Sequence, residues 1–504
     1  MKILFLSPEV APFAKTGGLA DVAGSLPKEL RNLGADVCVI FPFYRVVRQG
    51  NFKAHEVLKG INIPLGQRQY SSSIYQVAWD GGVPVYLVER EDMYDRPNLY
   101  GDLRGDYYDN LERFTFLSHA ALKFTEKNNF IPDIIHCHDW QTGLVPALIK
   151  GPYSSSRALK DTKSVFTIHN IGYQGIFPAD DFNVTALPIS DFFHQEGMEF
   201  WGNFSLLKAG IIYSDAVTTV SPQYARDIRT AEYGMGMEEI LQFRGPSLSG
   251  ILNGVDYGIW NPSDDQHIAE KYSVEDIKGK SVCKESIINE MGLSPSVKDG
   301  PLLCAVSRLD IQKGMDLIIK ILDKILKMDV GIIILGSGGG EIEEKLLRVS
   351  KGNEGRVGIK IGFDDGLAHR IIAGSDIFMI PSRYEPCGLT QMYALKYGTV
   401  PVVRATGGLD DTISEYNPDT GKGNGFKFYA FEPNEFLDAI KRALKLYRNK
   451  GKWKNLIKTG MESDFSWGRS ARKYLKLYET ILRDNRRYSK NSRRGNLGSA
   501  VNSL

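Results

Sequence analysis

The chain has 504 residues, more than one ordinary hydrophobic core organises, so two or more domains are expected. Its hydrophobic content of 42% and charged content of 24% are typical of globular proteins, and the formal charge of +2 disfavours a polyanionic partner such as nucleic acid. No apolar run approaches the ~20 residues that span a bilayer, and the N-terminus lacks the length and cleavage chemistry of a signal peptide. A soluble, cytoplasmic protein is therefore expected.

Cysteine usage points to the same compartment. The five cysteines are odd in number and far apart, and three lie inside apolar, strand-like runs, as reduced and buried thiols do. They are Cys38, Cys137, Cys283, Cys304 and Cys387.

Short, apolar, β-rich runs recur along the chain with helix-length spacers between them. In chain order they are KILFL, ADVCVIF, VPVYLV, DIIHC, SVFTI and DAVTTV, then LLCAVS, GIIIL, VGIKI, DIFMI and PVVR. Runs that are apolar on both faces and separated by helices are typical of parallel strands covered by helices. The pattern predicts two α/β sheets.

A segment rich in Gly, Asn and Pro at residues 253–262 marks the expected boundary between an N-terminal domain, residues 1–255, and a C-terminal domain, residues 256–467. An apolar stripe predicts a final helix at about 468–485, which follows the second domain but could pack on either one. The basic tail, residues 486–504, is rich in Ser, Asn and Gly, and we expect it to be disordered rather than to bind nucleic acid.

The motif Thr-Gly-Gly-Leu-x-Asp occurs twice, at residues 16–21 and 406–411, each time after an apolar run. Glycine suits a tight turn from strand to helix, and an aspartate in the first helical turn complements exposed N–H groups. The same geometry also forms an anion site, because unpaired N–H groups converge there with the helix dipole. Lys15 adds a charge to the first copy and makes it the stronger phosphate candidate.

Arg308 and Lys313 flank a turn directly after the run LLCAV. Two cations at the carboxyl end of a strand suit a diphosphate, although such residues also occur at solvated helix entries.

A third cluster lies in PSRYEPCGLTQMYALKYG, where Glu385 sits in a short loop between a strand and a helix. Its carboxylate could accept hydrogen bonds from sugar hydroxyls, while the amides of Gly388, Leu389 and Thr390 open the next helix toward an anion. A lone glutamate in a loop is also often simply solvated. Cys387 suits a small buried residue better than a nucleophile.

Histidines and an aspartate follow two strand-like runs in the first half, as His136, His138 and Asp139 and as His169. They could be core histidines, sugar ligands or a zinc site, and the zinc interpretation is disfavoured because no HExxH or CxxC pattern accompanies them. The loop LGSGGGE lacks the third glycine of a dinucleotide fingerprint. Three acidic pairs are expected to be caps and solvated turns rather than Mg²⁺ ligands: residues 264–265, 364–365 and 410–411.

Six ordered blocks of the chain, from residue 2 to about residue 480, resemble the bacterial glycogen synthase and plant starch synthase family. The blocks are KTGGLADV, HCHDWQTGL, TIHN, SRLDIQKGMDL, PSRYEPCGLTQMYALKYGTVPVVRATGGLDDT and FSW. The resemblance implies an α/β protein of the GT-B fold, in which two Rossmann-like parallel-sheet domains face each other across a deep cleft and the final helix returns to the first domain. It also implies transfer of glucose from ADP-glucose to the non-reducing end of an α-1,4-glucan such as glycogen, with retention of configuration and with no metal or other cofactor.

The resemblance assigns roles by matching position: cations neutralise the donor's diphosphate, a helix start cradles it, and a carboxylate holds the transferred glucose. The expected catalytic residues are Lys15, Asp139, His169, Arg308, Lys313 and Glu385. The expected substrate-binding residues are Lys15, Gly18, Asp21, Asn253, Cys387, Gly388, Leu389 and Thr390.

The chain departs from related retaining transferases at one position. These enzymes often carry a second glutamate eight positions after the first, and this chain has Tyr393 there. The departure favours the glycogen synthase branch and leaves ribose recognition without an assigned residue. Two alternatives stay open: another retaining GT-B glycosyltransferase that uses UDP-glucose or a small acceptor, and a catalytically silent glucan-binding protein.

Overall fold

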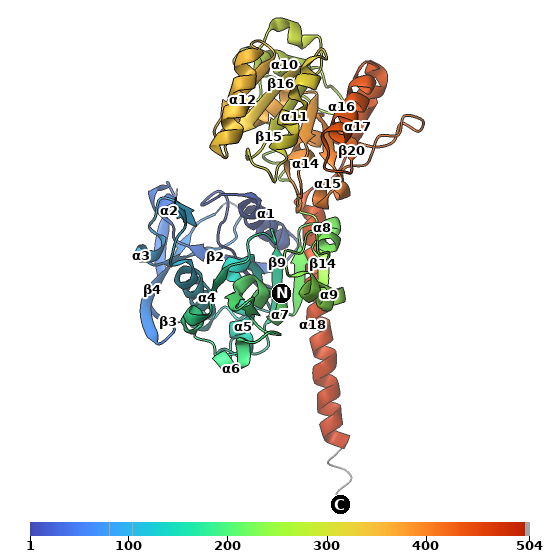
Figure 1. The fold of residues 1–504 in the computed structure, drawn as a ribbon. Coiled ribbons are helices and arrows are strands. Elements are labelled where there is room, and N and C mark those ends of the chain that lie inside the picture. Colours follow the sequence, from blue (N-terminus) through green and yellow to red (C-terminus); the bar gives the residue numbers. More distant parts are fainter. Residues whose placement is uncertain (80, 103, 499–504) are drawn as a thin grey trace, which may run out of the picture. The chain divides into compact units, whose positions relative to one another are not determined.

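The computed structural model describes residues 1–79, 81–102 and 104–498, with side chains as far as residue 483. The chain divides into two compact units, which are described separately (Figure 1). Unit 1 comprises Met1–Val220, Ile228–Ile251 and the chain from Trp467 onward, and unit 2 comprises Ser221–Asp227 and Leu252–Ser466. The predicted boundary at residue 255 thus falls within a few residues of the last crossing into unit 2, but the structure also assigns the segment Ser221–Asp227 to unit 2.

Unit 1 is built on a mixed sheet with the strand order β14-β13-β9-β8-β1-β2-β5-β4-β3. The strands from β14 to β5 run parallel, whereas β3 and β4 form an antiparallel hairpin on β5. The strands are β1 (Lys2–Leu6), β2 (Asp36–Pro42), β3 (Ala54–Leu65), β4 (Arg68–Val77), β5 (Val85–Glu89), β8 (Ile134–His138), β9 (Lys163–Ile168), β13 (Ala216–Thr219) and β14 (Leu248–Gly250). Short strands outside this sheet are β6 (Gly101–Asp102), β7 (Gly105–Asp106), β10 (Ile176–Pro178), β11 (Glu199–Phe200) and β12 (Asn203–Ser205).

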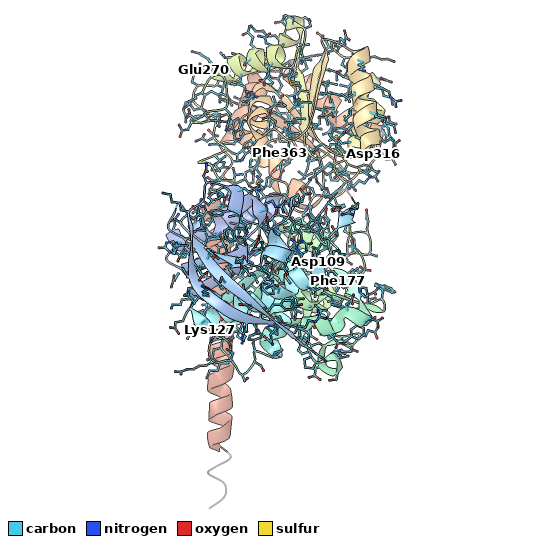
Figure 2. The ribbon with its side chains drawn as sticks, turned by 90° about the vertical axis from the view of Figure 1, so that its left-hand side faces the viewer. Asp109, Lys127, Phe177, Glu270, Asp316 and Phe363 are labelled. Carbon is cyan, nitrogen blue, oxygen red and sulfur yellow. The ribbon has the colours of Figure 1, made fainter. Side chains whose placement is uncertain are left out.

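The helices of unit 1 are α1 (Gly18–Asn32), α2 (Arg45–Gln49), α3 (Glu91–Tyr94), α4 (Asn110–Lys127), α5 (Leu144–Lys150), α6 (Ile189–Phe192), α7 (Leu206–Tyr213), α9 (Glu238–Arg244) and α18 (Trp467–Gly498). The helix α4 is buried along most of its length, and its ends carry charges that complement its dipole: Asp109 precedes it and Lys127 ends it (Figure 2).

The helix α18 packs on α1 and buries Tyr474 and Tyr478 completely. The Tyr478 hydroxyl lies 2.7 Å from Nδ1 of His136 on β8, which ties this helix to the sheet of unit 1. The backbone of α18 continues to Gly498, past the start of the tail that the sequence predicts to be disordered; residues 499–504 of that tail lie outside the described residues. Among the described helices, none is both long and apolar enough to cross a membrane.

Unit 2 is built on a parallel sheet with the strand order β17-β16-β15-β18-β19-β20. Its strands are β15 (Leu302–Val306), β16 (Gly331–Gly336), β17 (Val357–Ile361), β18 (Ile377–Ile380), β19 (Val400–Arg404) and β20 (Phe426–Phe428). Its helices are α8 (Pro222–Asp227), α10 (Gly279–Glu290), α11 (Met315–Leu326), α12 (Gly340–Gly352), α13 (Asp365–Gly374), α14 (Thr390–Lys396), α15 (Gly407–Thr412), α16 (Pro433–Tyr447) and α17 (Lys450–Met461). The strands are apolar on both faces because helices cover both sides of such a sheet.

The strand orders define a switch point in each sheet. In unit 1 the chain leaves β1 for β2 on one side and later reaches β8 on the other, with Leu4 of β1 opposite both Cys38 and Ile135. In unit 2 it leaves β15 for β16 and later reaches β18 on the other side. In open α/β sheets, ligands bind beyond the carboxyl ends of the strands at such a point. The loops after β1, β8, β15 and β18 are therefore the first places to look for a site.

One acidic pair differs from the prediction of caps and solvated turns. Asp364 does cap α13, since its Oδ1 accepts a hydrogen bond of 2.8 Å from the Leu367 amide. Asp265, in contrast, is buried, and its Oδ2 accepts from the Tyr397 hydroxyl at 2.6 Å and lies 2.7 Å from Nδ1 of His369. The expectation of a solvated turn is wrong there, because the side chains that cover Asp265 come from distant parts of the chain and its local sequence does not indicate them.

Candidate functional site

In unit 2, the turn after β15 carries Arg308 and Lys313. The Arg308 side chain is 51% exposed and pairs with Asp310 at 3.1 Å, so its guanidinium keeps donors directed to solvent. Gly314, in the left-handed conformation at φ 72°, closes this turn, and a Cβ there would lie 2.0 Å from the carbonyl oxygen of Pro381. The turn after β15 is thus pressed against the end of β18, which brings the two loops of the switch point together.

Lys313 makes an ion pair with Glu385, with 2.6 Å between Nζ and Oε2. The Glu385 side chain is only 8% exposed, and the same Oε2 accepts a hydrogen bond of 3.1 Å from the Ser382 hydroxyl. A buried carboxylate needs such partners to stay charged. Its other oxygen, Oε1, has no hydrogen-bond partner among the described residues, which leaves it available to a ligand hydroxyl.

The chain after Glu385 turns into α14 through Gly388, Leu389 and Thr390. Gly388 has φ 68°, which an L side chain rarely adopts, and the three amides find no acceptor in the described part of the chain. They form an opening toward which an anion would be drawn. Burial raises the pKa of the Cys387 thiol to about 12, so this side chain is not a thiolate nucleophile at neutral pH.

Asn253 belongs to the same cluster, because its backbone contacts the Cys387 sulfur. The residue is buried, and its side-chain Oδ1 lacks a hydrogen-bond partner within the described structure. An unpaired buried oxygen carries a desolvation cost, which a bound ligand can relieve.

The second Thr-Gly-Gly-Leu copy packs against the backbone of the Glu385 loop and supports it, rather than forming a site of its own. The Gly408 amide donates to the carbonyl oxygen of Glu385 at 3.0 Å, and a Cβ at Gly407 would lie 2.0 Å from that same oxygen. The Gly407 amide donates to Asp227 of α8 at 2.9 Å. The Ser221 hydroxyl, just before α8, donates to the Pro386 carbonyl at 2.7 Å. Sequence reasoning missed Ser221 and Asp227, because nothing in their local sequence signals contacts so far along the chain.

In unit 1, the loop after β1 carries Lys15, whose Nζ lies 2.7 Å from Oδ1 of Asp21 in the first turn of α1. Gly18 is the first residue of that helix, so its amide belongs to the unpaired N-terminal group. Gly17 is fully extended at φ −158°, and a Cβ there would meet nothing closer than Oε1 of Glu9 at 4.0 Å. The protein itself therefore imposes no requirement for glycine at position 17, unlike at Gly407.

Glu9 holds this loop in place and was not singled out from the sequence. Its Oε2 accepts hydrogen bonds from the Thr16 amide at 2.6 Å and from the Thr16 hydroxyl at 2.7 Å. Burial raises the pKa of Glu9 to about 7 despite these two donors. A lone acid that follows an apolar strand, in the segment SPEV, is the signal that could have found it.

Asp139 and His169 lie at the ends of the neighbouring strands β8 and β9. Oδ1 of Asp139 accepts a hydrogen bond of 2.6 Å from the His169 amide, and Asp139 adopts φ 55°, a conformation that costs energy outside glycine. Burial raises the pKa of Asp139 to about 7 and lowers the pKa of His169 to about 3. His169 is therefore neutral at physiological pH, whereas Asp139 is poised between its two forms.

The other two histidines of this region are core residues with protein partners. Nε2 of His136 lies 2.6 Å from the Thr167 hydroxyl, and Nδ1 of His138 lies 2.9 Å from Nε2 of His169. Across the residues that the structure describes, no three His, Cys, Asp or Glu side chains come together as metal ligands would.

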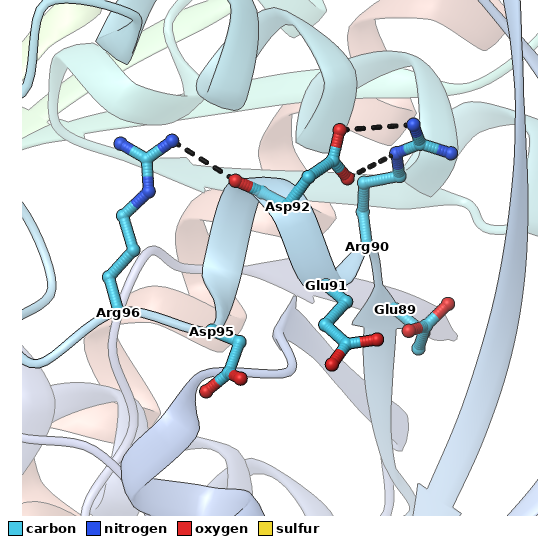
Figure 3. A pocket seen from close by; sticks show the side chains of 6 residues that line it. All are labelled: Glu89, Arg90, Glu91, Asp92, Asp95 and Arg96. Carbon is cyan, nitrogen blue, oxygen red and sulfur yellow. Dashed lines mark hydrogen bonds and ion pairs between the residues drawn. The ribbon is translucent and has the colours of Figure 1, made fainter.

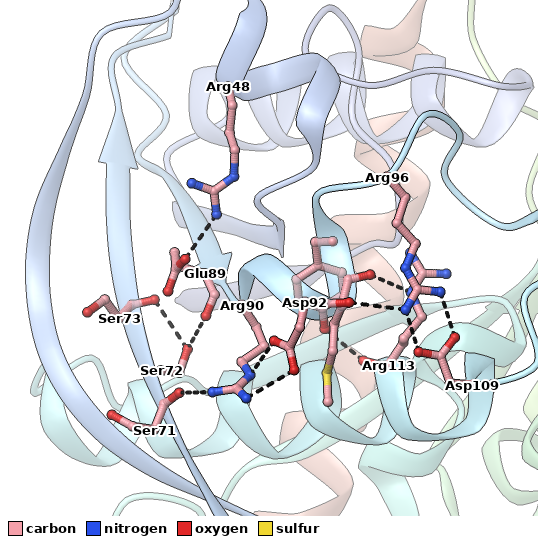
Figure 4. A network of polar contacts seen from close by, with 12 residues as sticks. Arg48, Ser71, Ser72, Ser73, Glu89, Arg90, Asp92, Arg96, Asp109 and Arg113 are labelled. Atoms are coloured by element: carbon pink, nitrogen blue, oxygen red, sulfur yellow. Dashed lines mark hydrogen bonds and ion pairs between the residues drawn. The ribbon is translucent and has the colours of Figure 1, made fainter.

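An open surface pocket of about 580 Å³ lies elsewhere in unit 1, at the end of β5 and along α3 (Figure 3). Its lining residues are Glu89, Arg90, Glu91, Asp92, Asp95 and Arg96. Most of these charges are already paired. Figure 4 shows the pairs of Arg48 with Glu89, Arg90 with Asp92 and Arg96 with Asp109. Arg45 pairs with Asp95. This network anchors the loop after β5 to the body of unit 1, and it does not share residues with the switch-point loops.

Comparisons with known proteins match both halves of the chain. Residues 2–243 match the family model "Starch synthase catalytic domain", and residues 289–460 match "Glycosyl transferases group 1". The glycogen synthase of Koribacter versatilis (strain Ellin345) is 44% identical over 95% of this chain and 98% of its own length. The glycogen synthase of Myxococcus xanthus (strain DK1622) is 46% identical over 96% of this chain and its entire length.

A solved structure agrees with these matches. The catalytic domain of starch synthase IV from Arabidopsis thaliana, bound to ADP and acarbose, superposes with a TM-score of 0.89 at 33% identity, over 95% of this chain and 99% of that one. Sucrose-phosphate synthase from Thermosynechococcus elongatus shares the fold alone, with a TM-score of 0.60 at 17% identity. The α/β architecture of the GT-B type that the sequence predicts is confirmed.

Proposed function

Because the chain belongs to the family of glycogen synthases and starch synthases, we propose that it transfers glucose from ADP-glucose to the non-reducing end of an α-1,4-glucan such as glycogen. The ADP in the structure of the plant relative supports an adenine nucleotide as the leaving group. We further propose that the transfer retains the anomeric configuration and needs no metal. Five buried, unpaired cysteines support a reducing, cytoplasmic location.

The observation that carries the proposal is the ion pair between the half-buried Lys313 and the buried Glu385 at the switch point of unit 2. One ammonium hydrogen of Lys313 binds Glu385, which leaves the others for a phosphate oxygen. Arg308 supplies a second cation from the same turn. As the bond to the diphosphate breaks, negative charge grows on its oxygens, and fixed cations stabilise that state more than the ground state.

The remaining residues take roles that their contacts suit. The free oxygen of Glu385 would accept a hydroxyl of the transferred glucose, and the amides of Gly388, Leu389 and Thr390 would cradle the diphosphate. Cys387 and Asn253 would line the donor site beside them.

In unit 1, the open space at Gly17 and the adjacent amide of Gly18 would admit the donor, with Lys15 and Asp21 beside it. Asp139 and His169 would bind the glucose hydroxyls near the reacting carbon. These assignments predict that replacing the residues lowers turnover.

The test is incorporation of labelled glucose from ADP-glucose and from UDP-glucose into glycogen. We expect ADP-glucose to be the better donor, and incorporation from neither would overturn the proposal. Arg308→Ala and Lys313→Ala should each reduce kcat by about 10²-fold or more. Matched controls in the same unit are Arg348→Ala and Lys345→Ala, whose partners are only exposed glutamates one helical turn away. Preference for UDP-glucose, or transfer only to small acceptors, would favour a different retaining glycosyltransferase.

A further inference from the structure

Among the residues that the structure describes, the ring of His138 makes one polar contact, and that contact is with His169. Nδ1 of His138 lies 2.9 Å from Nε2 of His169, and the ring of His138 is completely buried. A hydrogen bond between two neutral imidazoles holds one hydrogen, which belongs to one ring or to the other. The direction of this bond therefore decides which nitrogen of His169 carries its hydrogen.

Both rings are neutral, so each carries one N–H group. Burial lowers the pKa of His169 to about 3 and holds the pKa of His138 well below its usual range. Two arrangements follow. In the first, His138 donates from Nδ1 and its Nε2 is a bare lone pair. In the second, His169 donates from Nε2, and His138 carries its own hydrogen on Nε2.

The surroundings of His138 separate these arrangements. Its Nε2 is buried and has no hydrogen-bond partner among the described residues. The second arrangement would leave an N–H donor buried without an acceptor, which is among the rarest and costliest defects in protein interiors. The first leaves only an unused lone pair. The first arrangement is therefore favoured, and it leaves the hydrogen of His169 on Nδ1.

We propose that His138 is a positioning residue that holds His169 in the tautomer with its hydrogen on Nδ1, so that His169 offers a hydrogen-bond donor to an oxygen of the substrate. The Nδ1 atom of His169 has no partner within the described structure, and the residue keeps 9% exposure. The identity of that oxygen, a hydroxyl of the transferred glucose, rests on the proposed function. The tautomer itself does not.

The neighbours of His138 keep its ring from turning away. His136 lies two residues earlier on the same face of β8, with the two ring centroids 4.1 Å apart. His136 is itself fixed from both sides, by the Tyr478 hydroxyl at 2.7 Å and by the Thr167 hydroxyl at 2.6 Å. Phe5 of β1 packs on the His138 ring with a centroid distance of 4.2 Å. The His169 amide, bound to Asp139, fixes the other end of the pair.

Nitrogen NMR of protein labelled with 15N-histidine tests the proposal directly, because protonated and bare imidazole nitrogens have well-separated shifts. The signal of His169 is assigned by its loss in His169→Gln. We expect a protonated Nδ1 and a bare Nε2 in the unmodified protein. In His138→Leu the ring should move toward the Nε2–H form that free histidine favours. An Nε2–H tautomer of His169 in the unmodified protein would overturn the proposal. Unchanged His169 nitrogen signals in His138→Leu would overturn it as well.

Kinetics supply the second readout. His138→Leu should lower kcat/KM for ADP-glucose about tenfold. His138→Asn keeps an amide donor near the position of Nδ1, and it should recover most of that loss. His119→Gln is the control, because this core histidine of unit 1 contacts Tyr153 and Thr185 rather than the His138–His169 pair, and it should leave the His169 tautomer unchanged. If His138→Leu does not fold, the spectrum of the unmodified protein still decides. If no glucosyl transfer is found, the proposed function fails while the tautomer remains testable.

Discussion

Replacing Gly407 by alanine should destabilise unit 2, whereas the same replacement of Gly17, at the equivalent position of the other Thr-Gly-Gly-Leu copy, should leave folding intact. Gly407 has φ 45°, and a Cβ there would lie 2.0 Å from the carbonyl oxygen of Glu385. Gly17 is extended, with open space around its Cβ position to 4.0 Å. The two glycines share a sequence motif, but only Gly407 needs a positive φ and the absence of a Cβ.

The structure sets the size of the difference. An alanine forced into the left-handed region costs about 1 to 2 kcal/mol. Overpacking against a backbone oxygen, which no rotamer change can relieve, costs about 1 to 3 kcal/mol more. Gly407→Ala should therefore lower the free energy of unfolding of unit 2 by about 2 to 5 kcal/mol. Gly17→Ala should change stability by less than about 0.5 kcal/mol, as surface substitutions without a specific defect do.

Hydrogen exchange read by mass spectrometry measures this difference in each unit separately. In Gly407→Ala, peptides that cover Glu385 and α15 should exchange faster, while peptides of unit 1 stay unchanged. In Gly17→Ala exchange should match the unmodified protein, and the KM for ADP-glucose should rise because the methyl group occupies space proposed for the donor. Unchanged protection in Gly407→Ala would refute the steric argument. Weakened protection of α1 in Gly17→Ala would refute the claim that this glycine is not structural.

Three further predictions follow from the charges of the site. Lys313→Ala should lower the free energy of unfolding by about 3 kcal/mol, because it leaves the Glu385 carboxylate buried without its cation; urea denaturation that matches the unmodified protein would contradict this. The raised pKa of Glu9, about 7 against 4.5, means that its contribution to stability is present below about pH 4.5 and is lost as the pH rises through 7. Glu9→Gln should abolish this loss, on the order of 3 kcal/mol, in unfolding curves measured at pH 4.5 and 8. EDTA should leave glucosyl transfer unchanged, and a loss restored by Mg²⁺ would make the acidic pairs metal ligands.

The strands and helices of the fold could be predicted from the sequence, because each strand run is apolar on both faces and each spacer is long enough for a helix. All three cysteines placed in strand-like runs lie in buried strands, in β2, β8 and β15. The residues with strong local signals, such as Arg308 and Lys313 after β15, could also be located. Their position at the carboxyl ends of strands follows from chain order alone.

What the sequence could not supply was any contact whose two partners lie far apart in the chain. In the sequence, Glu9 is simply an acidic residue that follows a strand. The hydrogen bonds from Thr16 to its carboxylate form only in the folded loop. The local sequence predicts that Asp265 lies in a turn. In the structure it is buried against His369 and Tyr397, which lie more than a hundred positions away in the chain. Such pairs depend on how helices and loops stack, which local propensity does not encode.

Strand order explains why the two copies of Thr-Gly-Gly-Leu differ. The first copy follows β1, which lies at the switch point of unit 1, where the loops of neighbouring strands diverge and leave room beside Gly17. The second follows β19, one strand away from the switch point of unit 2 between β15 and β18. The loop of β18, which carries Glu385, therefore fills the space beside the second copy, and Gly407 and Gly408 must be glycines to let that loop approach. The same local motif thus leaves open space in one sheet and supports the Glu385 loop in the other, and its place in the strand order decides which.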